Sequence, residues 1–428
     1  MKVGILGGGI TGIAIQHFLR HPSEVLEAET TPGGLCRTFF KDGFGYDIGG
    51  HILFSKHEII NQLVEKLLGE NINHCKRNNK IYYNGRFVKY PFENGIGALD
   101  KHEAYDCLID YLKNDFAKPT NLKEWCYYTF GKSIAEKYLI PYNDKIWNLS
   151  SEQLSLEWVD RIPKPPVDDV VKSAMGIETE GYLHQLFFKY PKIGGMEALV
   201  RCLIKQESNV TCNFRVKSIR RMKHEWAVSD GQTTKHYDKI IVAFPIHEAI
   251  HCFENIPSTV KSAVENLRYN TINIAMLGVN NESLLDKSAI YIPDRDVVTH
   301  RICYMGYFSK QLIKPGTSSL IAEITTNPGD TIHELSNASM IEKVANDLDR
   351  INLIQKQDII VSDITRMKYG YPVYDLNYTK NTKIFKEYFS SIDVTLCGRF
   401  AEFDYINSDE CLRRAMVLST HWNESLQT

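Results

Sequence analysis

Three glycines near the start of the chain have the spacing of a loop that holds phosphates. Gly7, Gly9 and Gly12 follow a short apolar run, residues 3–6, and precede a helical pattern. Gly7 permits a tight turn, Gly9 lets the backbone approach a pyrophosphate, and Gly12 lets helix and strand pack closely. A second apolar run ends at Glu27, whose carboxylate can accept hydrogen bonds from a ribose. The pattern predicts a dinucleotide site, with a glycine-rich turn of an ordinary α/β protein as the competing interpretation.

Two further glycine pairs precede residues that could act on such a ligand. Gly33 and Gly34 come before Arg37, which suits a loop over a pyrophosphate with a basic counter-charge. Gly49 and Gly50 come before His51, and a backbone without side chains lets a flat ring approach closely. Taken alone, a histidine after two glycines is more often a structural histidine whose hydrogen bonds are satisfied within the protein.

Composition excludes several classes of protein. The chain has 428 residues, 43% of them hydrophobic, which allows a large core and more than one domain. A formal net charge of −2 gives no electrostatic case for nucleic acid. The 10 cysteines show neither CxxC nor zinc-like spacing, so no metal site is predicted. No apolar run reaches the roughly 20 residues of a membrane span, and the first strand follows the N-terminus directly, so we expect a cytoplasmic protein.

Together these segments resemble the FAD-binding fold shared by amine oxidases, protoporphyrinogen oxidases and UDP-galactopyranose mutases. The implied fold class is α/β, with a Rossmann-like FAD-binding domain interleaved with a helical insertion and an antiparallel-sheet substrate domain. The resemblance assigns FAD contacts to Gly7, Gly9, Ile10, Thr11, Gly12, Glu27, Ala28, Gly34, Leu35, Arg37, Gly49, Gly50, His51 and Arg399.

The hydrophobic pattern indicates where the domains lie. We expect a discontinuous FAD-binding domain at residues 1–75, 190–265 and 385–428, a mainly helical insertion at 95–185, and a substrate sheet at 76–94 and 266–384. Helices are expected at 57–68, within 99–150 and from near Ser408. Residues 80–89 form a predicted hairpin around Asn84-Gly85. Strands are expected at 24–27, 215–221, 225–229, 239–245 and 394–400, and residues 187–196 are expected to be loop.

Three further motifs resemble the eukaryotic-type UDP-galactopyranose mutases in particular. They are Tyr90-Pro-Phe, Pro141-Tyr-Asn143 with Trp147, and Trp158-Val-Asp-Arg161. The resemblance implies that Arg161 and Arg301 grip a diphosphate, for which a guanidinium fork is well suited. It implies catalytic or diphosphate-contacting roles for His51, Arg161, Arg301, Tyr371, Arg399 and Tyr405, with Arg399 and His51 beside the flavin.

The same resemblance implies a base pocket and raises two questions about it. Substrate contacts are assigned to Phe54, Tyr90, Glu93, Asn143, Trp147, Arg161, Arg301, Tyr307, Tyr371 and Tyr405. Glu93 stands where the family has a glutamine that reads uracil; a carboxylate only accepts hydrogen bonds, so a CDP-sugar is an alternative to a UDP-sugar. Either Tyr307 or its neighbour Phe308 faces the substrate.

The implied activity is ring contraction of a nucleoside-diphosphate hexose, from pyranose to furanose, through a covalent adduct to N5 of reduced FAD and without net redox change. NADPH or NADH is the expected reductant, and a monomer or homodimer is expected. An FAD-dependent amine or protoporphyrinogen-type oxidase, or a non-catalytic flavoprotein, are the alternatives.

Overall fold

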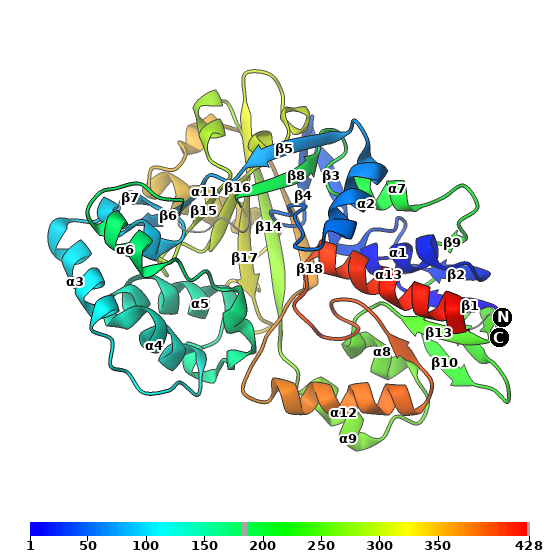
Figure 1. Cartoon of the computed structure of the whole chain (residues 1–428). Helices are drawn as coiled ribbons and strands as arrows, with labels where there is room; N and C mark the ends of the chain where they lie inside the picture. Colours follow the sequence, from blue (N-terminus) through cyan, green and yellow to red (C-terminus); the bar gives the residue numbers. More distant parts are fainter. Residues whose placement is uncertain (181–185, 426–428) are drawn as a thin grey trace.

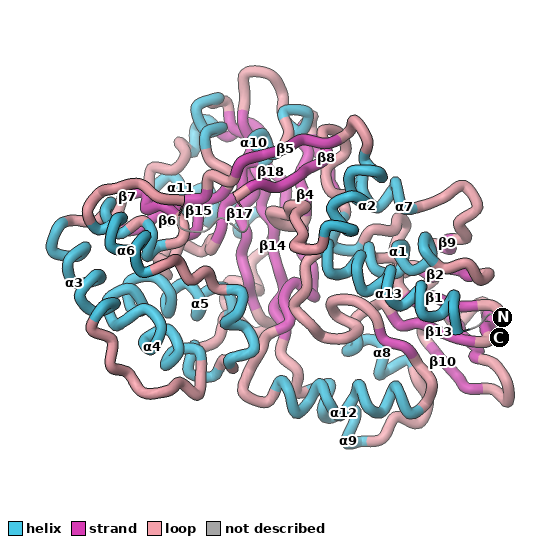
Figure 2. The backbone as a smooth tube through the Cα atoms, in the orientation of Figure 1, coloured by secondary structure: helices cyan, strands magenta, loops and turns pink. Residues whose placement is uncertain are grey.

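The computed structural model describes residues 1–180 and 186–425. Two main sheets lie next to each other, a parallel sheet close to both chain ends and a larger sheet in the middle of the molecule. A block of helices lies on the side of the larger sheet that is away from the parallel sheet, at the left in Figure 1. Figure 2 shows long loops where the two sheets meet.

The parallel sheet carries the N-terminal glycine loop. In spatial order its strands are β19 (Thr395–Leu396), β13 (Lys239–Val242), β1 (Val3–Leu6), β2 (Ser23–Leu26) and β9 (Val210–Thr211). Every neighbouring pair is parallel. β1 is buried along its whole length, as expected for a strand covered on both faces. Glu27 follows β2 directly, one residue beyond the strand's end.

The larger sheet has seven strands. In spatial order they are β18 (Ile359–Pro372), β14 (Tyr269–Val279), β17 (Ser318–Thr326), β16 (Arg301–Tyr304), β15 (Ala289–Tyr291), β6 (Asn79–Tyr83) and β7 (Arg86–Lys89). The pairs are antiparallel except β15 with β6, so the expected antiparallel sheet is mixed at that point. The predicted hairpin is confirmed, since Asn84 and Gly85 have φ of 47° and 76°, as a two-residue turn requires.

The helical block lies between β7 and β8 in the sequence. It contains α3 (Lys101–Leu112), α4 (Leu122–Ile134), α5 (Ile140–Trp147) and α6 (Val167–Ala174), with a π-helical turn, Ala135–Leu139, joining α4 to α5. The helical pattern predicted within residues 99–150 is therefore confirmed. The Asp100 side chain caps α3 by accepting hydrogen bonds from two backbone amides of its first turn.

The other helices pack around the two main sheets. They are α1 (Ile10–Phe18), α2 (Glu58–Leu68), α7 (Glu197–Leu203), α8 (Ile246–Cys252), α9 (Ser258–Glu265), α10 (Met305–Phe308), α11 (Asn337–Arg350), α12 (Tyr378–Ser391) and α13 (Ser408–Ser425). α1 packs against α13 along the parallel sheet (Figure 1). The predicted helices at 57–68 and from Ser408 are both present.

Three small sheets complete the described part of the fold, and two predicted segments differ from the structure. They are β3 (Thr38–Lys41) with β4 (Phe44–Asp47), β5 (Ile72–Lys76) with β8 (Phe187–Pro191), and β10 (Ser218–Arg221) with β11 (Trp226–Ser229) and β12 (Thr234–Tyr237). Residues 187–191 were expected to be loop, but they form a strand because β5 supplies its hydrogen-bonding partner. The strand expected at 394–400 is only two residues long, because the chain turns at Gly398, where φ is 110°.

Among the described residues, no helix is long and apolar enough to cross a membrane.

Candidate active site

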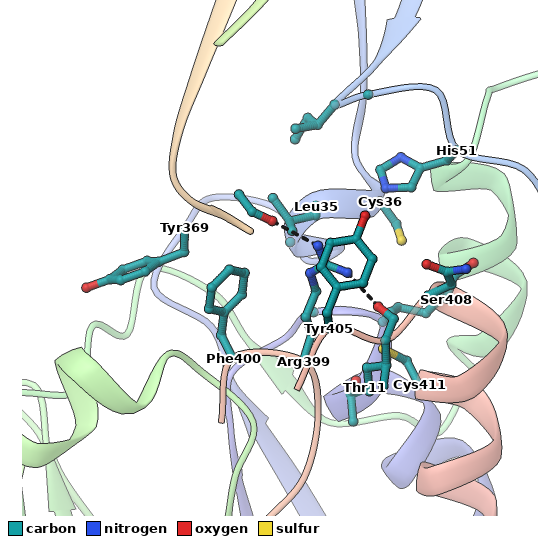
Figure 3. Close-up of a pocket in the computed structure, with 18 of the residues that line it drawn as sticks. Thr11, Leu35, Cys36, His51, Tyr369, Arg399, Phe400, Tyr405, Ser408 and Cys411 are labelled. Carbon is teal, nitrogen blue, oxygen red and sulfur yellow. Dashed lines mark hydrogen bonds between the residues drawn. The ribbon is translucent and has the colours of Figure 1, made fainter. Parts of the chain in front are cut away.

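A cavity of about 1300 Å³ lies where the two main sheets meet, and it is lined from many separate segments. Most of the predicted site residues line it: Gly7, Gly9, Ile10, Thr11, Glu27, Ala28, Gly34, Leu35, Gly49, Gly50, His51, Phe54, Tyr90, Arg161, Arg301, Tyr371, Arg399 and Tyr405. Figure 3 shows part of its wall, where Thr11, Leu35, His51 and Arg399 come from four segments far apart in the sequence.

The glycine loop forms one end of this cavity from backbone alone. Gly7 has a φ of 109°, which favours glycine. A side chain on Gly9 would meet nothing within 4 Å, so the backbone is open to a ligand. Ile10 begins α1, and the first amides of a helix have no partners within it, which makes this end suitable for an anion.

Gly12 acts on the packing behind the loop rather than on the cavity. A Cβ there would lie 2.0 Å from the Gly7 carbonyl oxygen, so only glycine fits between strand and helix. Gly12 is therefore absent from the cavity lining, although the reason given for it from the sequence, close helix–strand packing, agrees with this geometry.

Glu27 closes the loop against the second strand. Its Oε2 accepts a hydrogen bond of 2.7 Å from the Gly8 amide, and its Oε1 accepts one of 2.8 Å from the Glu29 amide. A carboxylate has about four acceptor positions, so both oxygens can also accept from the hydroxyls of a ribose. The backbone bonds fix the carboxylate at the cavity wall.

The Gly49-Gly50-His51 segment forms the middle of the wall. Gly49 has a φ of 99°, and the Gly50 amide donates a 2.9 Å hydrogen bond to the Glu323 carboxylate. Burial lowers the pKa of His51 to about 4, so its imidazole is neutral near pH 7. Its Nδ1 has no hydrogen-bond partner among the described residues.

Two of the predicted arginines, Arg161 and Arg301, line the cavity, and each also donates hydrogen bonds to an oxygen of the protein. Arg301 donates from Nε and Nη2 to Glu323, at 2.8 and 2.7 Å, in a bidentate pair. Burial opposes ionisation of Glu323, but Arg301 outweighs it and lowers the pKa of Glu323 to about 2. Arg161 donates to the Tyr405 carbonyl oxygen, and its guanidinium lies 5.0 Å from the centre of the Tyr405 ring.

Arg399 lies beside the tyrosine pair. It donates to the carbonyl oxygens of Ile406 and Gly370, at 2.7 and 3.1 Å (Figure 3), and its guanidinium lies 4.0 Å from the Tyr405 ring centre. Tyr371 and Tyr405 stack with their ring centres 5.5 Å apart. Burial and the neighbouring Glu323 hold the pKa of Tyr371 well above its usual value, so its hydroxyl is a donor. This part of the wall therefore offers cations and hydroxyl donors.

Asn143, Trp147 and Arg37 also lie outside the cavity lining, and the polar group of each bonds within the protein. Asn143 accepts from Trp147 Nε1 at 3.1 Å and donates to the Leu139 carbonyl at 2.8 Å, which holds α5 to its preceding turn. Trp147 instead supports the site from behind, against Tyr371 and Tyr405. Arg37 donates to the Gly34 carbonyl at 3.1 Å, so it stabilises that loop.

Tyr307 and Phe308, the two residues of which one was expected to face the substrate, point to different surroundings. The Tyr307 hydroxyl donates to the Lys76 carbonyl at 2.5 Å, whereas Phe308 lines the cavity. Phe308 rather than Tyr307 therefore faces the cavity in this structure, and a substrate contact through Tyr307 stays a prediction.

Glu93 is buried and also lies outside the lining. Both of its carboxyl oxygens lack hydrogen-bond partners among the described residues, and burial raises its pKa to about 8. At neutral pH the group is a carboxylic acid that can donate as well as accept. The premise that Glu93 can only accept hydrogen bonds does not hold at pH 7.

Sequence reasoning missed Glu323 and Tyr291. Glu323 is completely buried in β17 and contacts both Gly50 and Arg301. Its signal was present in the sequence as the single charged residue within the strand Ser318–Thr326. Tyr291 lines the cavity and stacks on Tyr90, with ring centres 4.8 Å apart, but nothing in its local sequence distinguishes it from other tyrosines.

The glycine loop, the helix N-terminus and Glu27 at the wall of one large cavity define a dinucleotide-binding protein. More specifically, the chain belongs to the family described as flavin containing amine oxidoreductase, whose profile matches residues 15–371. FAD is therefore the cofactor, and the predicted α/β flavoenzyme fold is confirmed. When bound, FAD supplies a flavin ring that can be reduced and reoxidised.

Curated relatives of the chain are oxidases. An L-amino-acid oxidase from Sistrurus catenatus edwardsii is 23% identical over 399 residues, which cover 84% of this chain and 72% of that protein. A coproporphyrinogen III oxidase from Staphylococcus aureus is 19% identical over 462 residues, covering 97% of each protein.

Solved structures show the same fold. A crystal structure of reduced UDP-galactopyranose mutase matches with a TM-score of 0.90 and 22% identity, covering 100% of this chain and 94% of the other. A putative protoporphyrinogen oxidase from Exiguobacterium sp. 255-15 matches with a TM-score of 0.78 and 17% identity, covering 99% of both.

Proposed function

We propose that the protein is a nucleotide-sugar mutase that converts the pyranose ring of a nucleoside-diphosphate hexose to a furanose, using reduced FAD without net redox change. One observation carries this proposal. Arg161 and Arg301, 140 positions apart in the sequence, line the same cavity as Gly49, Gly50 and His51. We call the wall formed by Gly49, Gly50 and His51 the flavin wall. A pair of guanidinium groups is well suited to hold a diphosphate next to it, and the fold of the mutase structure adds support.

The residues that line this part of the cavity have different proposed roles, which follow from their charge. Arg161 and Arg301 bind the diphosphate and stabilise it as the leaving group when the anomeric bond breaks. Tyr371 and Tyr405 border the same region of the wall, where their hydroxyls can donate to phosphate oxygens. His51 is neutral, so it can exchange hydrogen bonds with the cofactor or sugar without adding a charge. Reduced FAD, when bound, supplies a nucleophilic nitrogen, N5, at this wall.

The activity is tested by incubating dithionite-reduced protein with a panel of UDP-, CDP- and dTDP-hexoses. Furanose product is then sought by chromatography or NMR. We expect furanose from at least one member of the panel and none from the oxidised protein. Failure of every member to yield furanose would remove the mutase assignment. NADPH and NADH replace dithionite in a second series, because a nicotinamide is the proposed physiological reductant.

The nucleobase is proposed to bind near Tyr90 and Tyr291, whose stacked rings line the far part of the cavity. A CDP-sugar is the proposed alternative to a UDP-sugar through Glu93, if this side chain turns toward the base. In its buried position Glu93 has a pKa of about 8. The protonated acid can pair with either base, whereas the carboxylate favours the amino group of cytosine.

The base preference is measured by titrating the oxidised protein with CDP and UDP at pH 7 and pH 9, following flavin fluorescence. The Kd ratio is expected to shift toward CDP at the higher pH. A Glu93→Gln variant should lose this pH dependence. Tighter UDP binding at both pH values, unchanged in the variant, would exclude the role of Glu93.

An FAD-dependent amine or protoporphyrinogen-type oxidase is the second candidate, because the curated relatives are oxidases. Such an enzyme transfers electrons from its substrate to oxygen and releases hydrogen peroxide. A peroxide assay with L-amino acids, amines and coproporphyrinogen separates the two functions. Peroxide formation above the rate without substrate would favour the oxidase.

A further inference from the structure

Glu323, in β17 of the larger sheet, contacts both Arg301 on the neighbouring strand β16 and the glycine pair that follows β4. Its carboxylate lies beneath the glycine pair, so that a Cβ added at Gly50 would come within 3.4 Å of Oε1 and one added at Gly49 within 3.7 Å of Oε2. It also faces Arg301 directly across the β16–β17 pairing. The side chain is completely buried, so water does not satisfy these oxygens.

The Glu323 carboxylate accepts hydrogen bonds from Arg301 and Tyr371 on one side and from the Gly50 amide on the other. Oε1 accepts from Arg301 Nε at 2.8 Å and from the Gly50 amide at 2.9 Å. Oε2 accepts from Arg301 Nη2 at 2.7 Å and from the Tyr371 hydroxyl at 3.3 Å. The thiol of Cys303 is a further, weaker donor, 3.6 Å from Oε1. The pairing fixes the plane of the guanidinium of Arg301, which lines the cavity.

We infer that Glu323 is a positioning residue that links anion binding at Arg301 to the backbone position of Gly50 at the flavin wall. The inference rests on the proposed function, because it concerns a diphosphate at Arg301. An anion attracts the guanidinium and weakens its bond to Glu323. A buried carboxylate that loses a donor is costly, so it holds its remaining backbone donor, the Gly50 amide, more firmly.

Such a link is reciprocal. If the anion changes the hold on Gly50, a change at the flavin wall must change the affinity for the anion by the same factor. Reduction of a flavin held at that wall is one such change. We therefore expect a nucleoside diphosphate to bind the oxidised and reduced proteins with Kd values that differ by a factor on the order of 5–150. Glu323 transmits this difference, so its replacement brings the ratio close to one.

The test uses the FAD-loaded protein and the variant Glu323→Gln, which keeps the shape but removes the charge. One readout is hydrogen exchange of the Gly50 amide without nucleotide, expected to accelerate on the order of tenfold in the variant. The other is the Kd of UDP and CDP for oxidised and dithionite-reduced protein. Glu24→Gln is the matched control, because Glu24 is also buried and hydrogen-bonded, to Tyr237 and Thr211, away from the cavity.

Faster Gly50 exchange together with a lost redox dependence of Kd supports the inference, provided that Glu24→Gln shows neither. Unchanged exchange, or a redox-dependent Kd that persists in Glu323→Gln, overturns it. If the wild type binds neither nucleotide, the proposed function fails, and with it the link to anion binding; the exchange readout then still reports whether Glu323 holds Gly50. Should Glu323→Gln fail to fold, Glu323→Asp is used, which keeps the charge but is too short to reach Arg301 and Gly50 together.

Discussion

The two ends of the cavity are built from different material. The end that would hold the dinucleotide consists mainly of backbone, from Gly7, Gly9 and the first amides of α1, together with the Glu27 carboxylate, which two amides hold in place. The opposite end consists of side chains, Arg161, Arg301 and Tyr371, whose charges and hydroxyls are shared with neighbouring groups. Substitutions in and directly behind the glycine loop act through steric fit, as at Gly12, whereas substitutions at the opposite end act through the balance of charge between neighbouring groups. Substitutions at each end test this difference.

Gly12→Val should have the largest effect, because its first added atom already lies 2.0 Å from a backbone oxygen. We expect destabilisation at or above the upper end of the roughly 1–3 kcal/mol typical of overpacking. The purified protein should lack FAD, as read from the ratio of absorbance at 450 and 280 nm. Gly316→Ala is the control, since a Cβ there meets nothing within 4 Å and the positive φ costs only about 1 kcal/mol. Full FAD content in Gly12→Val would contradict the packing role.

Arg301→Ala and Arg161→Ala should weaken nucleoside diphosphate binding alike but differ in stability. Each loses a charge-assisted contact, which raises Kd by about 30-fold or more, with FAD retained. Only Arg301→Ala leaves Glu323 as an unpaired buried carboxylate, which costs about 3–5 kcal/mol. Arg161 is exposed, so its loss costs about 0.5–1 kcal/mol. Isothermal titration and thermal unfolding measure the two effects; unchanged binding in either variant removes that arginine from the site.

Glu93→Gln should stabilise the protein, and increasingly so as the pH rises. The folded-state pKa of about 8 lies above the ordinary value of 4.5, so the folded protein binds more protons than the unfolded chain between these values. The contribution of Glu93 to wild-type stability is therefore greatest below pH 4.5 and falls as the pH rises through 8, by at most about 1.4 kcal/mol per pH unit. Urea unfolding of both proteins from pH 5 to 9 measures the gap. Glu24→Gln should instead destabilise, because Glu24 accepts hydrogen bonds from Tyr237 and Thr211. A pH-independent gap for Glu93→Gln would contradict the raised pKa.

Tyr307→Phe should have the smallest effect. Its hydroxyl bonds only a backbone carbonyl outside the cavity, so we expect a loss of about 0.5–1.5 kcal/mol in stability and no change in nucleotide Kd. Tyr371→Phe is the matched change within the cavity and should raise the Kd. Equal effects of the two substitutions on binding would show that the hydroxyl of Tyr371 does not contact the ligand.

The contrast between the two ends also explains what could be predicted from the sequence. Gly7, Gly9 and Glu27 act through local backbone geometry, so their spacing alone predicts the dinucleotide end. The α/β class, the hairpin at Asn84-Gly85 and the helix from Ser408 follow from similarly local patterns. The strand at residues 187–191 could not be predicted, because its partner β5 is more than 100 residues away.

The opposite end depends on contacts that no local pattern contains. Arg301 was found through resemblance, but its partner Glu323 lies 22 residues further along and meets it only across two paired strands. Asn143 belongs to a motif similar to that of the mutases, yet its amide bonds within α5 and its own preceding turn. Likewise, burial decides that Glu93 is protonated at neutral pH, and burial is a property of the folded chain.

We propose that this cavity performs an isomerisation in which FAD ends in the state in which it began. The direct measurement is anaerobic turnover of an NDP-hexose by protein reduced once with one equivalent of dithionite, with furanose followed by NMR and flavin by absorbance at 450 nm. The account predicts many furanose molecules per enzyme while the flavin stays reduced. Furanose limited to one per flavin, or reoxidation of the flavin in step with substrate loss, would contradict it.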